Sequence, residues 1–413
     1  MICKPIIENN LFIKNIEFPT SIMIKLTNAC NVTCYFCSQG IAGNIFLDKS
    51  IILKLQNEAK KYGVVDLIYS GGEPLLYPSI DEVIRNGYEL GLSQKLVTNG
   101  INLKNIKPTT IQMFDNIGIS IHGDENIHDF IVGKKGTYKK VLESLEYIND
   151  LPAKPEIIIN FTLTNENVNC LDHIMEISEK FNCHVSVARL NRIGKSSNIT
   201  NISEIIFDFF ENNTFNTFKM SNVIPPCQVG KKYRSFCHSC SAGIASVCIE
   251  ANGEVKICAS SSQIYGSIYE DDLFEIWNNP KFKEFRSLEW LPITCKVCRQ
   301  LSQCLGGCKA EHKIKGFTYD ELLFNDIINF SKKCKNERIC FSFTNIRKID
   351  ESYLILDYPN RILDKEGFLL IQQLLNIENF ENFLKTYPPK KQREIIDFLY
   401  LLYKEGLLQF EEK

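Results

Sequence analysis

Three cysteines lie close together near the start of the chain, at Cys30, Cys34 and Cys37. They follow an apolar run, Ser21 to Leu26, which predicts a buried strand just before them. Three thiolates at this spacing can bind three irons of a 4Fe-4S cube and leave the fourth iron open to a chelating ligand. The alternative is a zinc site or three unrelated thiols, but zinc prefers a fourth Cys or His nearby, and the first histidine downstream is His122.

The cysteine spacing, with the aromatic Phe36 directly before the last cysteine, resembles the signature of the radical S-adenosylmethionine (AdoMet) enzymes. The resemblance implies that the open iron holds the amino and carboxylate groups of AdoMet. It also implies that the reduced cluster splits AdoMet into methionine and a 5′-deoxyadenosyl radical, which abstracts hydrogen from a substrate. By the same resemblance, Phe36 would lie beside the adenine.

The overall composition limits what else the chain can do. Its 413 residues predict two or three domains, and its net charge of −2, without a Lys/Arg run, predicts no nucleic-acid or membrane partner. The segment Met1–Pro19 lacks the apolar stretch of a signal peptide, and no run reaches transmembrane length, so we expect a cytoplasmic protein. The 17 cysteines are then better explained by metal than by disulfides, because the cytosol keeps thiols reduced.

The first two hundred residues must position these cysteines. Strand-like apolar runs alternate with helical patterns, one of which predicts a helix from near Asp48 to Gly63. The runs are Ile22–Leu26, Val64–Tyr69, Lys95–Thr98, Ile117–Ile121, Ile157–Leu163 and Val185–Leu190. The alternation predicts a parallel α/β sheet, a partial (β/α)6 TIM-like barrel that is open on one side, with its site at the carboxyl ends of the strands. A partial barrel is also the fold that the resemblance implies.

A second motif follows the second strand, at Ser70-Gly71-Gly72-Glu73-Pro74. The two glycines let the backbone approach a ligand, and Glu73 offers a carboxylate to an ammonium group. Alone, this segment is equally a flexible turn before a helix. After the three cysteines, it resembles the family's methionine-binding motif, with Gly71 to Pro74 as cofactor-binding residues.

Two further cofactor candidates end the third and fourth strands, Asn99 and Ser120. By resemblance, Ser120 would contact the ribose or methionine part of AdoMet, whereas Asn99 is equally suited to cap the next helix. The chain departs from the family at Val132, where relatives often carry an arginine for the carboxylate of AdoMet. Lys134 or Lys135 would replace it only as a point charge, without a bidentate fork.

Cysteine density rises again after residue 235. The spacing around Gly253 resembles the seven-cysteine pattern of the SPASM domain, named for maturases of subtilosin, pyrroloquinoline quinone, anaerobic sulfatase and mycofactocin. The seven cysteines are Cys240, Cys258, Cys295, Cys298, Cys304, Cys308 and Cys334. A zinc ribbon is the alternative, because Cys-x-x-Cys pairs also suit zinc.

The SPASM resemblance implies two auxiliary 4Fe-4S clusters, which makes three clusters in all. The first would be held by Cys240, Cys258 and Cys308, and the second by Cys295, Cys298, Cys304 and Cys334. The first set needs a fourth thiolate, for which Cys248 is the candidate and Cys237 the reserve. If neither binds, the open iron would accept a substrate thiolate or another donor.

The last seventy residues differ in composition, because cysteine disappears after Cys340. Three short strands are expected at Phe341–Ile349, Tyr353–Tyr358 and Arg361–Leu363, followed by helices. The order resembles a winged-helix-like α+β element that binds the leaders of ribosomally made, modified peptides. The resemblance implies a leader groove formed by Arg361, Ile362 and Leu363 with Ile395 of a later helix; a generic winged helix or a dimerisation module is the alternative.

We therefore expect five segments: a lead-in at 1–20, the partial barrel at 21–200, a connector at 201–235, the SPASM domain at 236–340 and the winged-helix-like domain at 341–413. The expected function is a peptide maturase that closes a thioether or carbon-carbon crosslink. Its partners would be a precursor peptide with a leader and an electron donor such as flavodoxin or ferredoxin.

Three other functions remain open. A maturase of the sulfatase type would not need the last seventy residues, and an epimerase would need a hydrogen donor such as Cys170 or Cys183. An iron-sulfur electron carrier or sensor would leave the Gly71–Pro74 motif and Ser120 unexplained. The sequence identifies no catalytic acid, base or hydrogen donor.

Overall fold

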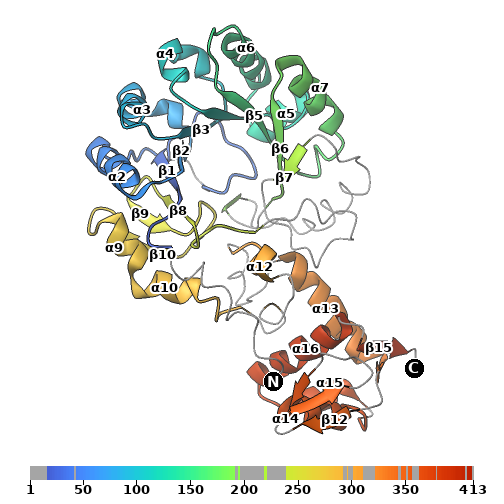
Figure 1. Ribbon diagram of the computed structural model, residues 1–413. Coiled ribbons are helices and arrows are strands. Elements are labelled where there is room, and N and C mark those ends of the chain that lie inside the picture. The colour runs from blue at the N-terminus through green and yellow to red at the C-terminus, as the bar shows by residue number, and fades with distance from the viewer. Residues whose placement is uncertain are drawn as a thin grey trace.

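The main body of the chain is one open ten-stranded sheet flanked by helices (Figure 1). The structure, a computed structural model, describes residues 16–40, 43–190, 194–195, 218–220, 239–291, 295, 301–309, 321–342, 346–349, 352–355, 362–377, 379–404 and 407–411. The strand order is β10-β9-β8-β1-β2-β3-β4-β5-β6-β7, and neighbours from β8 to β7 are parallel. The predicted α/β fold with a largely parallel sheet is therefore confirmed.

Among the described residues, the barrel part contains seven parallel strands with helices on their outer side (Figure 1), one more than the six predicted, because β7 lies within the predicted connector and pairs with β6. The strands are β1 (Ser21–Thr27), β2 (Asp66–Gly71), β3 (Gln94–Thr98), β4 (Asn116–Ser120), β5 (Glu156–Thr162), β6 (His184–Ala188) and β7 (Phe218–Met220). The helices are α2 (Lys49–Tyr62), η2 (Pro74–Leu76), α3 (Ile80–Glu89), η3 (Leu103–Asn105), α4 (Pro108–Ile111), α5 (Glu125–Val132), α6 (Thr137–Asn149) and α7 (Leu171–Phe181).

Helix α2 illustrates how the local sequence determines these elements. Its apolar stripe places Ile52, Leu55 and Ala59 in the core, as expected for one face of an amphipathic helix. The helix ends at Gly63, whose φ of 69° lies in the left-handed region and whose N–H donates to the carbonyls of Ala59 and Lys60. The predicted start near Asp48 and stop at Gly63 are both confirmed.

The cysteine-rich part continues the barrel sheet. Strand β8 (Ser246–Ile249) pairs in parallel with β1, and β9 (Glu254–Lys256) and β10 (Ile264–Ser267) extend the sheet as antiparallel strands. Helices α9 (Leu273–Asn278) and α10 (Pro280–Arg286) cover them. The buried side chains of Trp277 and Phe282 belong to the same hydrophobic core as the barrel.

The C-terminal unit lies apart from the barrel in Figure 1 and has its own core. Antiparallel strands β12, β13 and β14 form one sheet, and β11 pairs with β15 in another. The elements from here on are α12 (Leu301–Cys304), α13 (Glu321–Asn336), β11 (Arg338–Phe341), β12 (Ile346–Ile349), β13 (Ser352–Ile355), β14 (Ile362–Asp364), α14 (Lys365–Leu374), α15 (Phe380–Lys385), α16 (Pro389–Lys404) and β15 (Leu408–Glu411).

The predicted strand Phe341–Ile349 was wrong as a single strand. Phe341 ends β11, which pairs with the C-terminal strand β15, and Ile346 begins β12, which pairs with β13. The periodicity of the run could not reveal its two different partners. Phe330 and Cys334 of α13 pack into the core of the C-terminal unit, so α13 belongs to that unit. The boundary at residue 341 stays a prediction.

Candidate functional site

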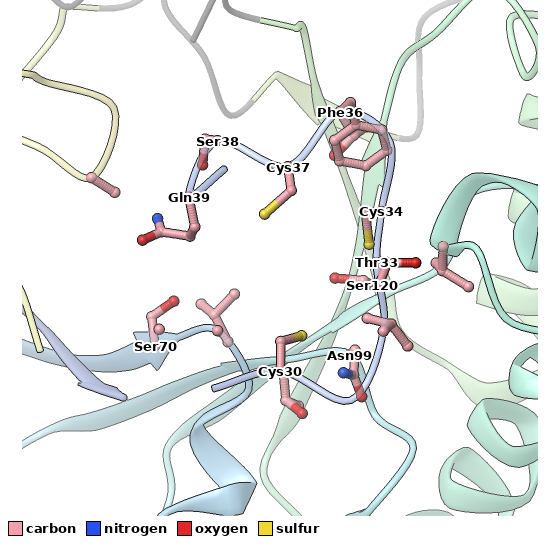
Figure 2. A pocket seen from close by; sticks show the side chains of 18 of the residues that line it. Cys30, Thr33, Cys34, Phe36, Cys37, Ser38, Gln39, Ser70, Asn99 and Ser120 are labelled. Atoms are coloured by element: carbon pink, nitrogen blue, oxygen red, sulfur yellow. The ribbon is translucent and has the colours of Figure 1, made fainter. Parts of the chain in front are cut away.

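The loop after β1, residues 28–40, carries the first three cysteines and is called the cluster loop below. Cys30, Cys34 and Cys37 are half-buried and line one cavity of about 300 Å³. Figure 2 shows their three sulfur atoms facing the same space inside the loop. This arrangement presents three thiols to one ligand, as a three-coordinated 4Fe-4S cube requires.

Helix α5 holds the cluster loop in this shape. The last carbonyls of a helix have no partner within it, and here those of Ile131 and Val132 accept hydrogen bonds from the N–H groups of Tyr35 (3.2 Å) and Thr33 (3.0 Å). At the end of β3, the Asn99 Nδ2 donates to the Asn31 Oδ1 of the cluster loop at 2.7 Å. These bonds attach the cluster loop to the barrel.

Cys30 and Cys34 are unfavourable as free thiolates. Burial, with smaller contributions from the neighbouring Cys37 and Cys30, raises the pKa of Cys34 to about 12. Burial is also the main cause of the raised pKa of Cys30. Thiolates crowded in this way need positive charge from bound iron, because metal ligands must be deprotonated. The donor set fits an iron-sulfur cluster.

The two glycines of the second motif bring the end of β2 against the cluster loop. A Cβ atom on Gly71 would lie 2.2 Å from the carbonyl oxygen of Thr27, and one on Gly72 would lie 2.2 Å from that of Ala29. The N–H of Gly72 instead donates to Thr27 O at 2.7 Å. Because a Cβ atom at either position would overlap the backbone, only glycine fits this contact. Both glycines also line the cavity.

Glu73 is fully buried, and its carboxylate already has partners in the protein. One oxygen accepts from the Thr98 hydroxyl at 2.6 Å and the other from the Asn99 N–H at 2.8 Å. Burial raises the pKa of Glu73, while these hydrogen bonds oppose that rise. The carboxylate thus joins the ends of β2 and β3, just before Pro74 opens η2. Its expected contact with an ammonium group stays a prediction.

The other predicted cofactor contacts lie on the walls of the same cavity. Phe36, Asn99 and Ser120 all line it, and Figure 2 shows them around the cysteines. The Asn99 Oδ1 accepts from the Ile101 N–H at 3.1 Å, so this side chain shapes the turn before η3; it does not cap that helix, whose N-cap is Asn102. The Phe36 ring meets the His122 ring edge-on, with centroids 5.2 Å apart.

Two histidines, His122 and His128, are buried behind this wall. The Nδ1 of His122 accepts from the Thr162 N–H and the Nδ1 of His128 accepts from the His122 N–H, both at 3.2 Å. Burial lowers the pKa of His122 to about 3 and that of His128 to about 4, so both rings are neutral near pH 7. Sequence reasoning did not identify this pair, because the link between the two histidines forms only in the fold.

The site lacks the family's arginine at Val132, whose side chain lines the cavity. Neither Lys134 nor Lys135 is among the residues that line the cavity, and the Lys134 Nζ donates to the Asn31 carbonyl at 3.0 Å; their expected role stays a prediction. Among the described residues, the lysines on the cavity wall are Lys25 and Lys195. The N–H of Lys195 donates to the Cys37 carbonyl at 3.0 Å.

Three cysteines of the first auxiliary set lie near one another beside β1. Burial raises the pKa of Cys258 to about 11 with a contribution from Cys240, and that of Cys248 to about 12 with a contribution from Cys258. Cys248 pairs with Met23 of β1 across the parallel ladder. Cys308 is buried, and Cys237 lies outside the described residues.

The second auxiliary set is described only in part, because Cys298 lies outside the described residues. Cys334 is buried in the core of the C-terminal unit, and Cys295 packs against that same core. Cys304 is buried at the end of α12. Within the described ranges, no three His, Cys, Asp or Glu side chains meet around one metal ion. A 4Fe-4S cluster does not require three ligands around one metal ion, because each cysteine binds a different iron.

The predicted leader groove is corrected at one position. Ile395 of α16 is 1% exposed and packs in the C-terminal core, so its side chain supports the unit and does not line an open groove. Its apolar stripe faces inward, as in most amphipathic helices. Ile362 and Leu363 belong to β14, an edge strand of its sheet among the described residues, and Arg361 lies outside them.

The two candidate hydrogen donors occupy opposite ends of the strands. Cys183 lies just before β6, at the amino end of the parallel sheet, whereas the cluster loop follows the carboxyl end of β1. Cys170 precedes α7 on the carboxyl side and lies beside Gly123. Of the two, only Cys170 is on the cavity's side of the sheet.

Comparison with known proteins agrees with this geometry. Residues 24–177 match the Radical SAM superfamily, and residues 237–304 match the SPASM iron-sulfur cluster-binding domain. Among solved structures, the chain is similar to Streptococcus suis SuiB bound to precursor peptide SuiA, with 20% identity, a TM-score of 0.59, and 76% of this chain and 78% of SuiB covered. It is also similar to anSMEcpe with bound AdoMet and Cp18Cys peptide, with 18% identity, a TM-score of 0.53, and 76% and 99% covered. At these identities, the similarity shows a common fold.

Proposed function

The chain is a radical SAM enzyme with a SPASM domain, and on that premise we propose that it oxidatively modifies a ribosomally made precursor peptide. The observation that carries the proposal is the cavity in which Cys30, Cys34 and Cys37 face one space beside the glycine motif. The similarity to two structures that hold peptides supports a peptide substrate.

We assign the binding of the cofactor to the residues around this cavity. Cys30, Cys34 and Cys37 would hold a 4Fe-4S cluster, and Phe36, Asn99 and Ser120 would orient AdoMet. When bound, this pair supplies a 5′-deoxyadenosyl radical that removes a hydrogen atom from the peptide. The apolar ring of Phe36, backed by the neutral His122, excludes water from the reacting atoms.

Crosslinking or desaturation removes two electrons from the peptide, so an electron acceptor is needed. The cysteines of the SPASM part are the proposed holders of two auxiliary 4Fe-4S clusters, three in the whole chain. Support comes from Cys240, Cys248 and Cys258, which lie near one another: Cys248 is on β8, the strand that continues the barrel sheet, and the other two are in loops. Cys248 is the proposed fourth ligand of the first auxiliary cluster.

The proposed partners are a precursor peptide with a leader and an electron donor such as flavodoxin or ferredoxin. A three-stranded sheet followed by helices supports leader binding by the C-terminal unit, because an extended leader can add to an edge strand such as β14. In the described parts of the chain, no helix has the length and apolar character to cross a membrane. A cytoplasmic location is proposed because reducing conditions keep the 17 cysteines free for iron.

The test is the mass of a candidate precursor peptide after anaerobic incubation in heavy water with reconstituted enzyme, reductant and AdoMet. Loss of two hydrogens is expected. Gain of one deuterium without that loss would indicate epimerisation, and a modified Ser or Cys on a folded sulfatase would indicate the sulfatase-type alternative. Absence of AdoMet cleavage in the presence of intact clusters would contradict the enzyme proposal and favour an electron carrier.

A further inference from the structure

A buried lysine on β1 has no role in the proposed function so far. Lys25 is 2% exposed, and its Nζ donates to Gln39 Oε1 at 2.9 Å, to Glu250 Oε1 at 2.7 Å and to the Ala259 carbonyl at 3.3 Å. An ammonium group has three N–H donors, and here each has an acceptor. Although Lys25 lines the cavity, it therefore has no donor left for a substrate.

The three acceptors lie beside both groups of cysteines. Gln39 belongs to the cluster loop and comes shortly after Cys37, whereas Ala259 directly follows Cys258. Glu250 comes just after β8, the strand that pairs with β1. One side chain thus connects the loop of the proposed AdoMet cluster to the loop of the proposed first auxiliary cluster.

Attachment of the SPASM part to the barrel does not require this ion pair. The parallel ladder between β1 and β8 already joins the two parts, and the Trp277 Nε1 donates to the Ile16 carbonyl at 2.9 Å. A buried charge is costly, and an apolar pair of similar size would usually be at least as stable. The position of Lys25 between the cluster loop and the Cys258 loop indicates a more specific role.

The charge of Lys25 reaches the auxiliary cysteines. Its Nζ bonds to the carbonyl of Ala259, the residue directly after Cys258, and its strand β1 pairs with β8, which carries Cys248. A buried positive charge this close to a bound cluster favours the more negative state of that cluster, which is its reduced state. Glu250 offsets part of this effect, because it lies against the same ammonium group.

We propose that Lys25 is a positioning residue that holds the Cys258 loop against the cluster loop and, by its charge, makes the first auxiliary cluster easier to reduce. This inference rests on the proposed function, in which that cluster accepts an electron from the peptide. Lys25 then has two effects. It sets the separation between the cluster loop and the Cys258 loop, and it favours the arrival of the electron at the first auxiliary cluster.

The test compares full-length reconstituted proteins by redox titration with electron paramagnetic resonance, without peptide. The signal of the first auxiliary cluster is identified as the one that Cys258→Ala removes. Lys25→Met should lower its midpoint potential, and Glu250→Gln should raise it, because the first removes a positive charge and the second a negative one. Hydrogen exchange of the backbone at 37–40 and 258–261 should become faster in Lys25→Met.

Lys256→Met is the matched control, because Lys256 pairs with the same Glu250 carboxylate at 3.4 Å but is more exposed than Lys25, and its other ion pair is with Glu254 of its own strand. It should shift the potential less and leave hydrogen exchange unchanged. If Lys25→Met fails to fold, the double variant Lys25→Met/Glu250→Gln removes both charges and should show fast exchange with a potential near wild type. An unchanged exchange rate, or a Lys25→Met shift no larger than that of Lys256→Met, would overturn the proposal.

A consequence for turnover separates this inference from the proposed function. Lys25→Met should raise the ratio of AdoMet cleaved to peptide oxidised, because electron transfer from the peptide is slower. If the wild-type enzyme oxidises no peptide, the proposed function fails. The potential and exchange measurements, made without peptide, decide the role of Lys25 in either case.

Discussion

The barrel and the SPASM strands share one hydrophobic core, whereas the C-terminal unit has a core of its own. The shared core runs from Ile22 of β1 to Trp277 and Phe282 of the cysteine-rich part. The separate core contains Phe330, Leu399 and their neighbours. The difference indicates that the SPASM strands form one body with the barrel, whereas the C-terminal unit is a separate module.

The largest expected losses of stability come from truncating one buried aromatic side chain in each core. Trp277→Ala should cost about 3–5 kcal/mol, because Trp277 is fully buried and its ring lies against the Arg286 guanidinium, 4.5 Å away. Phe398→Ala should cost a similar amount, since Phe398 is 2% exposed. Denaturant-dependent hydrogen exchange should show Trp277→Ala opening the barrel and SPASM strands together, and Phe398→Ala opening only the C-terminal unit. If both variants opened the whole chain in one common transition, the two cores would not be independent units.

Acid should weaken the barrel more than the C-terminal unit. Burial lowers the pKa of His128 from 6.5 to about 4, so the folded state resists protonation. Its stabilising contribution is complete above pH 6.5 and is lost as the pH falls towards 4, by up to about 3 kcal/mol. All six histidines precede the C-terminal unit, which lacks this source of acid sensitivity.

The variant that tests this is His128→Asn, whose Oδ1 can still accept the His122 N–H. Unfolding in urea at pH 7 and at pH 4.5 should show a smaller loss of stability in the variant than in wild type. His184→Asn is the control, because His184 is exposed at the start of β6. Equal pH dependence in wild type and His128→Asn would rule out this histidine as the cause.

A smaller effect is expected where the glycine motif meets the cluster loop. Gly72→Ala should cost about 1–3 kcal/mol and reduce the iron content of the reconstituted protein, because its Cβ would overlap the Ala29 carbonyl. Gly63→Ala has open space and should cost only about 1 kcal/mol for its positive φ, with iron content unchanged. Equal iron contents in the two variants would separate the glycine motif from cluster binding.

The smallest effect concerns a second ion pair between the barrel and the SPASM part, Lys54 with Asp272. Their side chains are 46% and 55% exposed, so solvent screens the pair, and Lys54→Met should cost less than about 1 kcal/mol. Thermal unfolding should barely change, and the auxiliary cluster potential should not change. A large effect here would mean that the shared core contributes less to this junction than its buried residues indicate.

Sequence periodicity was sufficient for much of the barrel. The apolar stripe of α2 and its stop at Gly63 depend on neighbours a few residues away, and such local signals are readable without the fold. The clustering of Cys30, Cys34 and Cys37 at a strand end was readable for the same reason. Helices α6 and α7 also bury apolar stripes with helical spacing.

Contacts between distant segments could not be read in this way. The pairing of β8 with β1, the capture of Glu73 by Thr98, and the two partners of the run from Phe341 to Ile349 depend on which elements meet after folding. Ile395 was misjudged because an apolar stripe shows that one helix face is buried without showing what covers it. Lys25 gave no signal, since its partners lie on three separate segments.

The parallel pairing of β1 with β8 has a consequence for synthesis on the ribosome. About 220 residues separate the two strands, so one edge of β1 waits on the order of ten seconds or more for its partner at ordinary translation rates. An unpaired strand edge is a template for pairing with other chains during that time. Slower translation of the region between them should therefore increase aggregation of the nascent protein.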